Sequence, residues 1–518
     1  MEQIRKLPIG IQSFEVLRTN NLVYVDKTAL IYELVSTSIP YFLSRPRRFG
    51  KSLLISTFEA YFKGRKDLFE GLAIEKLETK WETYPVLRLD LSGEDYNSMK
   101  TLNSTLSLQL SSWEKQWGKD EEEKTLSQRF KGVISRACEQ TGKRVVVLVD
   151  EYDKPLLDNI LDDKLSKSIR NTLKAFYGAL KGTGDYLRFI FLTGVTKFSQ
   201  ISVFSDLNQL TDISLVRDYA TLCGITQEEL VANFTPELTR MAEENAMSFD
   251  EAVAEMTQRY DGYHFAPHAP GMFNPFSVLN ALAYRTFGDY WFQTGTPTFL
   301  VDLLTESDYD LRLLVDGTHM AASGFAEYRA EKSNPIPLIY QSGYLTIHDY
   351  DKQYRLYTLG FPNDEVRYGF MSFLAPYYTK VDVGATEAHI VNFAKELKAG
   401  DVKSFLERMK VFFAGIPYEL SDDTERHYQA IFYVVLTLIG AFVQTEVRSA
   451  RGRADAVVKT DKYIYVFEFK LNDTAETALR QIDSKEYLLP YTLDGRKLVK
   501  VGVSFDKETR NIGRYLIG

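Results

Sequence analysis

The stretch IPYFLSRPRRFGKS (residues 39–52) decides the fold of the first half of the chain. Its apolar start, Ile39 to Leu43, predicts a short strand, and an amphipathic helix is expected from Leu53. Between a strand and a helix of this kind, backbone N–H groups and the positive end of the helix dipole can bind a phosphate group. The stretch therefore predicts a phosphate-binding loop within an α/β fold.

The residues Gly50-Lys51-Ser52 at the end of this loop complete the Walker A arrangement. In that arrangement the lysine reaches the β- and γ-phosphates of a nucleotide, and the serine hydroxyl holds Mg²⁺. We therefore expect Lys51 to bind phosphate and Ser52 to be a metal ligand. Arg45 occupies the place of the usual first glycine, so the loop matches the motif in part.

A second apolar run supplies the acidic partner that such a loop needs. Residues 145–149 are all valine or leucine, which is typical of a strand buried on both faces of a parallel sheet. The run ends in Asp150-Glu151, where Asp150 can hold Mg²⁺ through water and Glu151 can polarise the attacking water. The alternative role for this pair is a helix cap.

Two further strands are expected in the same sheet. Residues 86–91 predict one of them, and residues 189–192 predict the other. The second strand ends at Thr193, whose hydroxyl could sense the γ-phosphate. The order of loop, acidic strand and polar strand end favours a nucleotide site over three unrelated features.

Together these residues resemble the AAA-ATPase-like family of additional-strand P-loop proteins, and they are similar to archaeal-type and STAND ATPases. Pro46-Arg47-Arg48-x-Gly50-Lys51-Ser52 carries the match. The resemblance covers about the first half of the chain and implies a parallel sheet with ATP as the cofactor. It also assigns Arg47, Arg48 and Gly50 to nucleotide binding. Arg45 departs from the family's loop, so the resemblance implies ATP binding more directly than rapid hydrolysis.

Two carboxylates and a lysine in the last quarter of the chain form a second candidate site. In residues 466–470, period-two alternation places Glu468 and Lys470 on one face of a strand. Asp455 precedes a predicted hairpin turn at residues 459–462, which can bring its carboxylate beside Glu468. Two carboxylates can hold Mg²⁺, and a lysine can orient water or stabilise a phosphoryl transition state. The alternative is a surface hairpin with solvated charges.

Helices are expected on both sides of these strands, at residues 427–443 and 474–489. This order, with Asp455 and Glu468-x-Lys470 on the central strands, resembles the PD-(D/E)XK nuclease superfamily. The resemblance implies a restriction-endonuclease-like α/β domain over roughly the last quarter of the chain. It implies that Asp455 and Glu468 bind Mg²⁺ or Mn²⁺, and that Lys470 assists the attacking water.

The same resemblance implies roles for residues on the two helices. Gln481 would contact phosphate or water, and Glu425 would be an accessory acid. Glu446 is the alternative candidate for the accessory acid, and the sequence does not decide between Glu425 and Glu446. The implied partner is nucleic acid, with DNA favoured over RNA.

The composition sets limits on the class of protein. With 518 residues, several domains are expected, and 45% hydrophobic with 25% charged residues is typical of a soluble globular chain. Only two cysteines occur, Cys138 and Cys223, which excludes a disulfide framework or a cysteine zinc site and fits a reducing cytoplasm. The start predicts no signal peptide, and the apolar stretch 430–443 is too short to span a membrane. We therefore expect a cytoplasmic protein without a membrane partner.

The charge distribution limits how the chain can meet nucleic acid. The formal net charge of -8 argues against a protein that coats nucleic acid nonspecifically. Residues 441–518 reverse this balance, with 14 basic and 11 acidic residues, a net charge of +3. This mild excess permits DNA binding at the nuclease-like end.

Four domains are expected from the pattern of elements. They are an ATPase domain at residues 1–225, a helical lid at 226–310, a winged-helix-like module at 311–384 and a nuclease-like domain with a helical lead-in at 385–518. Thr226 is expected to cap the first lid helix. His264 and His268 have a spacing known from zinc sites, but Pro267 and the absence of nearby cysteines disfavour a metal there.

These features lead to three hypotheses. The first is an ATPase fused to a metal-dependent nuclease that cuts DNA, with a role in defence or mobile-element control by analogy. The second is a STAND-like switch that binds ATP and oligomerises without cutting; Arg45 favours it somewhat. The third, an interaction protein with relic sites, is disfavoured because both sets of residues are intact. A homo-oligomer could supply an arginine finger, for which Arg217 is one of many candidates.

Overall fold

The computed structural model describes most of the chain. The described residues are 6–160, 162–197, 204, 209–291, 300, 304, 314, 317–325, 334–379, 383–415, 425–440, 444–447, 454–470, 473–506, 508–509 and 511–518. They divide into two compact units. The N-terminal unit comprises Met1–Thr294 and His319–Asn363, and the C-terminal unit comprises Gly295–Thr318 and Asp364–Gly518.

A parallel sheet forms the centre of the N-terminal unit. Its strands are β1 (Tyr41–Ser44), β2 (Val86–Asp90), β3 (Val145–Asp150), β4 (Leu187–Gly194) and β5 (Thr211–Asp212). Their spatial order is β2-β3-β4-β1-β5, and each neighbouring pair is parallel. β4 therefore lies between β1, which precedes the phosphate loop, and the acidic strand β3. This order confirms the additional-strand α/β fold that the sequence predicts.

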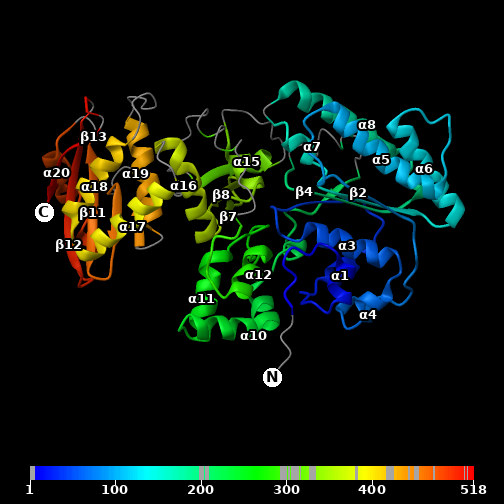
Figure 1. Cartoon of the computed structure of the whole chain (residues 1–518), viewed down its shortest axis with the longest axis horizontal. Helices are drawn as coiled ribbons and strands as arrows, with labels where there is room; N and C mark the ends of the chain where they lie inside the picture. The colour runs from blue at the N-terminus through cyan, green and yellow to red at the C-terminus, as the bar shows by residue number, and fades with distance from the viewer. Residues whose placement is uncertain are drawn as a thin grey trace. The chain divides into compact units, whose positions relative to one another are not determined.

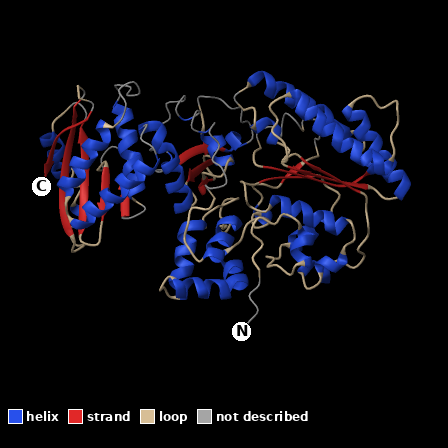
Figure 2. Cartoon of the chain, in the orientation of Figure 1, coloured by secondary structure: helices blue, strands red, loops and turns tan. Residues whose placement is uncertain are grey.

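Helices cover both faces of this sheet (Figures 1 and 2). Their bounds are α1 (Phe14–Thr19), α2 (Thr28–Val35), α3 (Lys51–Phe62), α4 (Ala73–Leu77), α5 (Met99–Trp117), α6 (Leu126–Thr141), α7 (Lys154–Leu157) and α8 (Asp163–Lys181). α5, α6 and α8 lie over one face, and α3 lies over the other with α1 and α4 beside it (Figure 1). The sheet is thus buried on both sides, as the all-apolar sequence of β3 requires.

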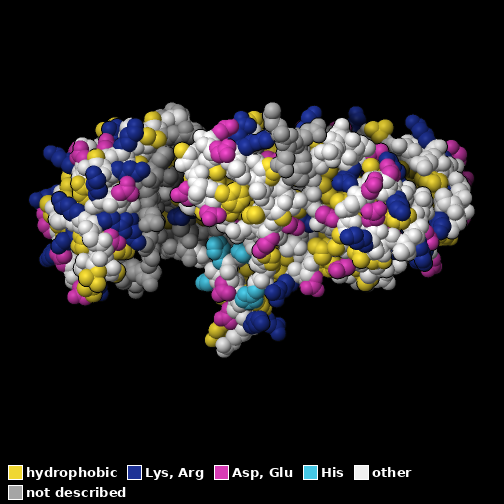
Figure 3. All heavy atoms as spheres, turned by 90° about the horizontal axis from the view of Figure 1, so that it is seen from below, with side chains coloured by type: hydrophobic (Ala, Val, Ile, Leu, Met, Phe, Trp, Pro, Cys, Tyr) yellow, Lys and Arg dark blue, Asp and Glu magenta, His cyan; other side chains and the backbone are white. Residues whose placement is uncertain are grey.

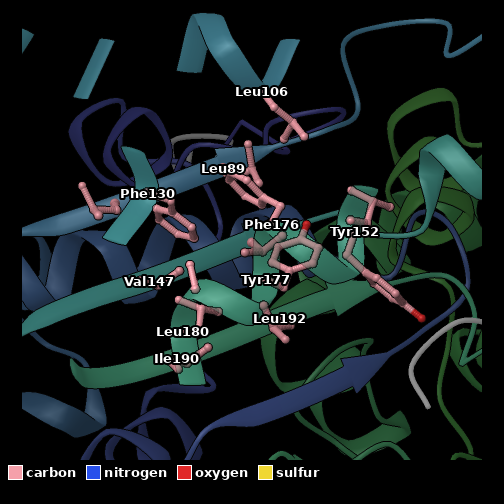
Figure 4. Packing of buried hydrophobic residues seen from close by; sticks show 14 of the residues in the cluster. Leu89, Leu106, Phe130, Val147, Tyr152, Phe176, Tyr177, Leu180, Ile190 and Leu192 are labelled. Atoms are coloured by element: carbon pink, nitrogen blue, oxygen red, sulfur yellow. The ribbon is translucent and has the colours of Figure 1, made fainter. Parts of the chain in front are cut away.

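A large apolar cluster fills the space between the sheet and α5, α6 and α8 (Figure 4). Val147 and Leu192 project from β3 and β4, and both are fully buried. Phe130 of α6 stacks on Phe176 of α8 with ring centroids 4.7 Å apart. This packing holds β3 and β4 rigidly, so the polar residues at their C-terminal ends have fixed positions.

A helical bundle and a small sheet complete the N-terminal unit. The bundle contains α10 (Gln227–Glu244), α11 (Phe249–Tyr260) and α12 (Pro275–Tyr284). Thr226 caps α10 in a capping box with Glu229, which confirms the expected helix start. The sheet has the order β6-β8-β7, with strands β6 (Thr318–Ala321), β7 (Thr346–Asp351) and β8 (Leu356–Gly360), and α15 (Ile336–Gln341) precedes β7.

The C-terminal unit contains a mixed sheet. Its strands are β9 (Gln444–Val447), β10 (Ala456–Lys459), β11 (Tyr463–Lys470), β12 (Lys497–Asp506) and β13 (Asn511–Ile517). Their order is β13-β12-β11-β10-β9, and only the β11–β12 pair is parallel. β10 and β11 form the hairpin that the sequence predicts, with its turn at residues 460–462.

Helices flank this second sheet. They are α16 (Asp364–Thr379), α17 (Val383–Ala399), α18 (Val402–Ala414), α19 (Glu425–Ile439) and α20 (Ala475–Ser484). Phe467 contacts Phe405 of α18, and Phe469 contacts Phe432 of α19, with ring centroids 5.7 and 4.3 Å apart. The alternate residue Val466 belongs to the apolar cluster of α20, which includes Ile482. β11 therefore buries aromatic side chains on one face and presents its other face to α20.

The expected helix, hairpin and helix near residues 338–373 correspond to α15, the β7–β8 hairpin and α16. The winged-helix assignment and the four domain boundaries stay predictions. In the described part of the chain, no helix combines the length and the apolar character needed to cross a membrane.

Candidate nucleotide-binding and nuclease sites

The phosphate loop connects β1 to α3 and has a constrained backbone. Gly50, the residue before α3, has φ = 90°, and Arg48 has φ = 70°. Both values lie in the left-handed region, which glycine adopts freely and arginine rarely. The Lys51 Nζ atom lies inside the loop and donates hydrogen bonds to the carbonyl oxygens of Arg45 and Pro46, at 3.0 and 3.1 Å. The loop thus holds its lysine where a phosphate oxygen can replace a carbonyl.

A cleft of about 700 Å³ opens beside this loop. Its lining includes most of the predicted nucleotide-binding residues, namely Arg47, Arg48, Gly50, Lys51, Ser52 and Glu151. Arg48 lies over the ring of Phe276, with its Cζ atom 4.9 Å from the ring centroid. Phe276 and Pro275 at the start of α12 also line the cleft. The start of α12 therefore closes one side of the cleft, a place that the sequence left without a chemical role.

The acidic residues at the end of β3 lie beside the polar end of β4. The Thr193 hydroxyl donates a 2.7 Å hydrogen bond to Oδ1 of Asp150. Oδ2 of Asp150 is buried and has no hydrogen-bond partner within the described structure. A buried carboxylate oxygen without a donor is costly, and Mg²⁺ with its waters is the kind of group that would satisfy it. Asp150 and Thr193 do not line the cleft themselves, but Asp150 precedes Glu151, which does, so Ser52 and Asp150 are the residues that would hold Mg²⁺.

Glu151 has the environment expected of a residue that activates water. Its φ of 51° is unusual for a residue other than glycine. Burial raises the pKa of the Glu151 carboxyl, and the nearby charge of Lys51 partly opposes this rise. A raised pKa makes the carboxylate a better proton acceptor.

Asp153 is a residue of this site that sequence reasoning missed. It is fully buried, and its carboxylate accepts hydrogen bonds from the backbone N–H groups of Val195 and Thr196 at 3.2 and 2.6 Å. Gly194 permits this approach, because a Cβ atom there would lie 2.6 Å from Asp153 Oδ1. The spacing Asp150-Glu151-x-Asp153 was the available signal. Asp153 fixes the chain that follows Thr193 and also lines the cleft.

Arg45 points away from the phosphate cleft. Only 1% of its surface is exposed, and its guanidinium donates hydrogen bonds to the carbonyl oxygens of Ser44, Ser214 and Tyr219 at 2.9, 2.9 and 3.0 Å. Its Cζ atom lies 4.1 Å from the ring centroid of Phe265. The arginine in place of the first Walker A glycine therefore joins the loop to the chain after β5 and to an aromatic turn.

A smaller apolar cavity of about 110 Å³ continues from the phosphate loop. Gly50, Leu53 and Leu279 line both this cavity and the larger cleft. Lys27 also lines it and forms a 2.5 Å ion pair with Glu229, the capping-box residue of α10. An apolar cavity with few polar groups beside a phosphate loop is suited to a flat heterocyclic base.

The nuclease-like residues come together at one end of the β10–β11 hairpin. Oδ2 of Asp455 accepts a 2.8 Å hydrogen bond from the backbone N–H of Phe469, which places Asp455 beside Glu468. Glu468 is 2% exposed. Its Oε1 atom accepts a 2.9 Å hydrogen bond from Nζ of Lys470, while Oε2 is buried and has no hydrogen-bond partner within the described structure.

The helix α20 supplies the fourth predicted residue. Lys470 Nζ donates a 2.7 Å hydrogen bond to Oε1 of Gln481, so the lysine joins the helix to Glu468. Gln481 Nε2 in turn lies 3.3 Å from the hydroxyl of Tyr487. Tyr487 is a second residue that sequence reasoning left without a role. Its hydroxyl completes a chain of side chains from Tyr487 through Gln481 and Lys470 to Glu468.

The accessory acid stays open. Glu425 begins α19, and Glu446 lies opposite Val457 in the β9–β10 pair, but both side chains lie outside the described part. Gly452 and Arg453, which precede Asp455 in the motif, are also outside the described residues.

The pair Asp455 and Glu468 fits a divalent metal. Burial raises the pKa of Glu468, and the neighbouring charge of Asp455 raises it further, while Lys470 opposes both effects. Two adjacent carboxylates with a buried unpartnered oxygen are the donor set that Mg²⁺ or Mn²⁺ accepts. In the described part of the chain, no three acidic, histidine or cysteine side chains gather as a metal-binding group, so these two carboxylates form a pair.

These geometries define a P-loop nucleotide-binding protein of the additional-strand class with a second α/β domain of nuclease type. Comparisons with known proteins agree. Residues 8–204 match the family model described as "Predicted AAA-ATPase", and residues 423–515 match the model of the PD-(D/E)XK nuclease superfamily. A curated relative from Azotobacter chroococcum mcd 1, described as "Uncharacterized protein in vnfD 5'region", is 34% identical over 527 residues.

That alignment covers 99% of this chain and 99% of the relative. The chain therefore belongs to the AAA-ATPase-like family and carries a C-terminal domain of the PD-(D/E)XK nuclease superfamily. Domains of these two kinds generally use a nucleotide and a divalent metal, and a nuclease domain indicates a nucleic-acid substrate.

Proposed function

We propose that this protein binds ATP and hydrolyses phosphodiester bonds of DNA in a reaction that requires Mg²⁺ or Mn²⁺. One observation carries the nuclease part: Lys470 is hydrogen-bonded to both Glu468 and Gln481, while Glu468 is buried against Asp455. A solvated surface hairpin would not bury a carboxylate of this kind or raise its pKa. The phosphate cleft beside Lys51 supports the nucleotide part.

Each residue of the nuclease site has a distinct role in this proposal. Asp455 and Glu468 would hold the metal, which supplies a bound water of lowered pKa and positive charge near the phosphoryl oxygens. The Lys470 ammonium has three N–H donors, and its described acceptors take two of them. The third can orient the attacking water or stabilise the charge that develops on the phosphoryl group. Gln481 keeps the ammonium in position.

The nucleotide site would control the reaction rather than perform it. Lys51 can exchange the loop carbonyl oxygens for phosphate oxygens when ATP arrives. Arg45 and Asp153 connect the loop and the end of β4 to neighbouring segments, so the loop cannot move alone. Slow ATP turnover would then set how long DNA stays accessible. A role in defence or mobile-element control rests on analogy with proteins of similar domain content.

A nuclease assay tests this proposal. Wild-type protein and the Lys470→Ala variant are incubated with supercoiled, linear and single-stranded DNA and with RNA, while metal and ATP are varied independently. Loss of one preorganised charged donor typically lowers a rate about 100- to 1,000-fold. We expect such a loss for Lys470→Ala and wild-type rates for Lys462→Ala, a matched change in the hairpin turn. Equal cleavage by wild type and Lys470→Ala would show that the nuclease assignment is wrong.

A STAND-like switch is the second candidate, and Arg45 is the observation that favours it. A fully buried arginine that braces the phosphate loop suits tight ATP binding with slow hydrolysis. In this case the C-terminal domain would recognise nucleic acid or protein without cutting. Measurement of ATP turnover and particle mass with and without ATP separates the two candidates. ATP-dependent assembly with slow turnover supports the switch, and steady turnover stimulated by DNA supports the nuclease.

A further inference from the structure

One flank of α20 faces the nuclease residues. Thr474, Thr477, Gln481 and Lys485 follow one another at spacings of three and four residues, which places them along one side of the helix. Gln481 marks that side as the one beside the site, because its Oε1 atom accepts a hydrogen bond from Lys470. Lys485 follows Gln481 by one helical turn, about 6 Å along the axis.

Lys485 is an exposed cation at the C-terminal end of α20, and the exposed Glu486 follows it in the chain. Its side chain is exposed, and no acidic residue of the described structure forms an ion pair with it. Such a side chain keeps its full charge for an incoming anion, whereas a cation already paired must first give up its partner.

The opposite flank of the same helix is neutralised. Glu476 pairs with Arg514 of β13 at 2.8 Å, and Asp483 pairs with Lys500 of β12 at 2.6 Å. These pairs compensate the basic side chains of the neighbouring strands. Figure 3 shows Lys and Arg side chains gathered on the C-terminal unit, at the left of the view. Two basic side chains of this unit, Lys500 and Arg514, are therefore already paired with carboxylates.

The N-terminal end of α20 is also unfavourable for phosphate. Asp473 lies there, and hydrogen bonds from Thr474 and Thr477 hold its pKa below the usual range, so it stays charged. A strand bound at Asp455 and Glu468 would meet this negative charge if it ran toward the start of α20. Toward the end of the helix it meets Lys485 instead. The charges therefore give the strand a direction.

We propose that Lys485 binds the phosphodiester backbone of the substrate strand, next to the phosphate that lies at Asp455 and Glu468. This inference rests on the proposed nuclease function and names the surface that receives its substrate. The backbone follows the Gln481 flank of α20 toward Lys485 and avoids the flank of Glu476 and Asp483. The ligand chemistry is a chain of phosphodiesters, which DNA and RNA share.

Binding measured at several salt concentrations tests this inference. Full-length protein in EDTA, which prevents cleavage, is titrated into fluorescently labelled single-stranded DNA, duplex DNA and single-stranded RNA, with anisotropy as the readout. One phosphate contact contributes about 0.7 to 0.9 to the slope of log K against log salt concentration. We expect Lys485→Ala to lower the slope by that amount on the preferred substrate and Lys485→Arg to retain it. The three substrates identify the nucleic acid.

Lys403→Ala is the matched control, because it removes the same charge from the same unit. Lys403 is exposed and lies on α18, which packs on the face of β11 opposite to α20. We expect it to leave the slope unchanged. If Lys485→Ala keeps the wild-type slope and affinity, the inference is wrong and the nuclease assignment is untouched. If wild-type protein binds none of the substrates, the inference is wrong, and the cleavage assay with metal decides the proposed nuclease function separately.

Discussion

The two sites of this protein both place a lysine near a buried carboxylate, but they hold that lysine in different ways. Lys51 donates to carbonyl oxygens of its own loop, whereas Lys470 donates to the side chains of Glu468 and Gln481. The first lysine must leave its partners to bind a phosphate. The second is already in the position that its chemistry needs.

This difference separates a responsive site from a preorganised one. Backbone carbonyls exist in every loop, so the position of Lys51 depends on the loop conformation, which Arg48 and Gly50 hold in left-handed geometry. The position of Lys470 depends on particular side chains from one strand and one helix. Substitutions at the nuclease site should therefore have local effects on chemistry, and substitutions at the loop should change the nucleotide response.

Glu468→Gln gives the largest effect that we expect. The amide cannot carry the negative charge that a metal ligand needs, and metal catalysis contributes several kcal/mol to such reactions. Cleavage should fall by about a thousandfold or more, since each 1.36 kcal/mol is a factor of ten. ATP affinity should stay at the wild-type value, measured by calorimetry on the same preparation. A parallel loss of ATP affinity would show that the two sites are not locally independent.

Lys51→Ala should have the next largest effect, now on the nucleotide site. Hydrogen bonds to charged groups contribute about 1.5 to 3 kcal/mol each, so loss of the lysine should weaken ATP binding by about 100-fold. Lys63→Ala, at the exposed end of α3, is a matched control. The metal-dependent cleavage rate without ATP should be unchanged in both variants. If Lys51→Ala binds ATP like wild type, the cleft beside the loop is not the nucleotide site.

The fold could be predicted because it depends on patterns that a sequence displays directly. The apolar run at residues 145–149 predicts a strand buried on both faces, and every residue of β3 is buried. Alternation in residues 466–470 placed Glu468 and Lys470 on one face, and that face meets α20 while the aromatic side chains meet α18 and α19. Element ends moved by two residues at β1, which begins at Tyr41 rather than Ile39, and by five at α20, which ends at Ser484 rather than Leu489.

The sequence could predict only those residues of the two sites that belong to a short motif. Arg45 and Asp153 act through partners far away in the chain, such as Tyr219 for Arg45, and Tyr487 acts through Gln481, six residues before it. No local pattern shows which carbonyl or amide a long side chain will reach. The apolar cavity beside Lys27 could not be predicted for the same reason. Lys27 lines this cavity and contacts Glu229, which lies 202 residues further along the chain.

Arg45→Gly tests how the position of Lys51 depends on its loop, because it restores the first glycine of the Walker A consensus. We expect weaker ATP binding, by about tenfold, rather than faster hydrolysis. The substitution removes hydrogen bonds to the carbonyl oxygens of Ser214 and Tyr219, leaves the buried Ser214 carbonyl without its arginine donor, and frees the loop that positions Lys51. ATP affinity and turnover of wild type, Arg45→Gly and Arg45→Lys are measured together. Tighter binding with faster turnover in Arg45→Gly would contradict a bracing role for this arginine.

Tyr487→Phe should have the smallest effect, and it tests how far the preorganisation of the nuclease site extends. It removes the hydroxyl that contacts Gln481, so Gln481 and then Lys470 lose part of their restraint. Loss of one neutral hydrogen bond costs about 0.5 to 1.5 kcal/mol, or a 2- to 10-fold slower cleavage. The direction of the accompanying pH change follows from Glu468, whose pKa Lys470 lowers and burial raises.

If Lys470 is held less firmly beside Glu468, its positive charge lowers the pKa of Glu468 less, and this pKa rises further. A carboxylate must lose its proton to bind a metal, so metal affinity falls as the pH drops through that pKa. The acid side of the pH profile should therefore move to higher pH in Tyr487→Phe, both for Mn²⁺ binding without substrate and for cleavage. Tyr491→Phe, in the same segment but outside this chain of hydrogen bonds, serves as the control. A slower Tyr487→Phe enzyme with an unshifted profile would show that the tyrosine supports the fold of α20 without acting on Glu468.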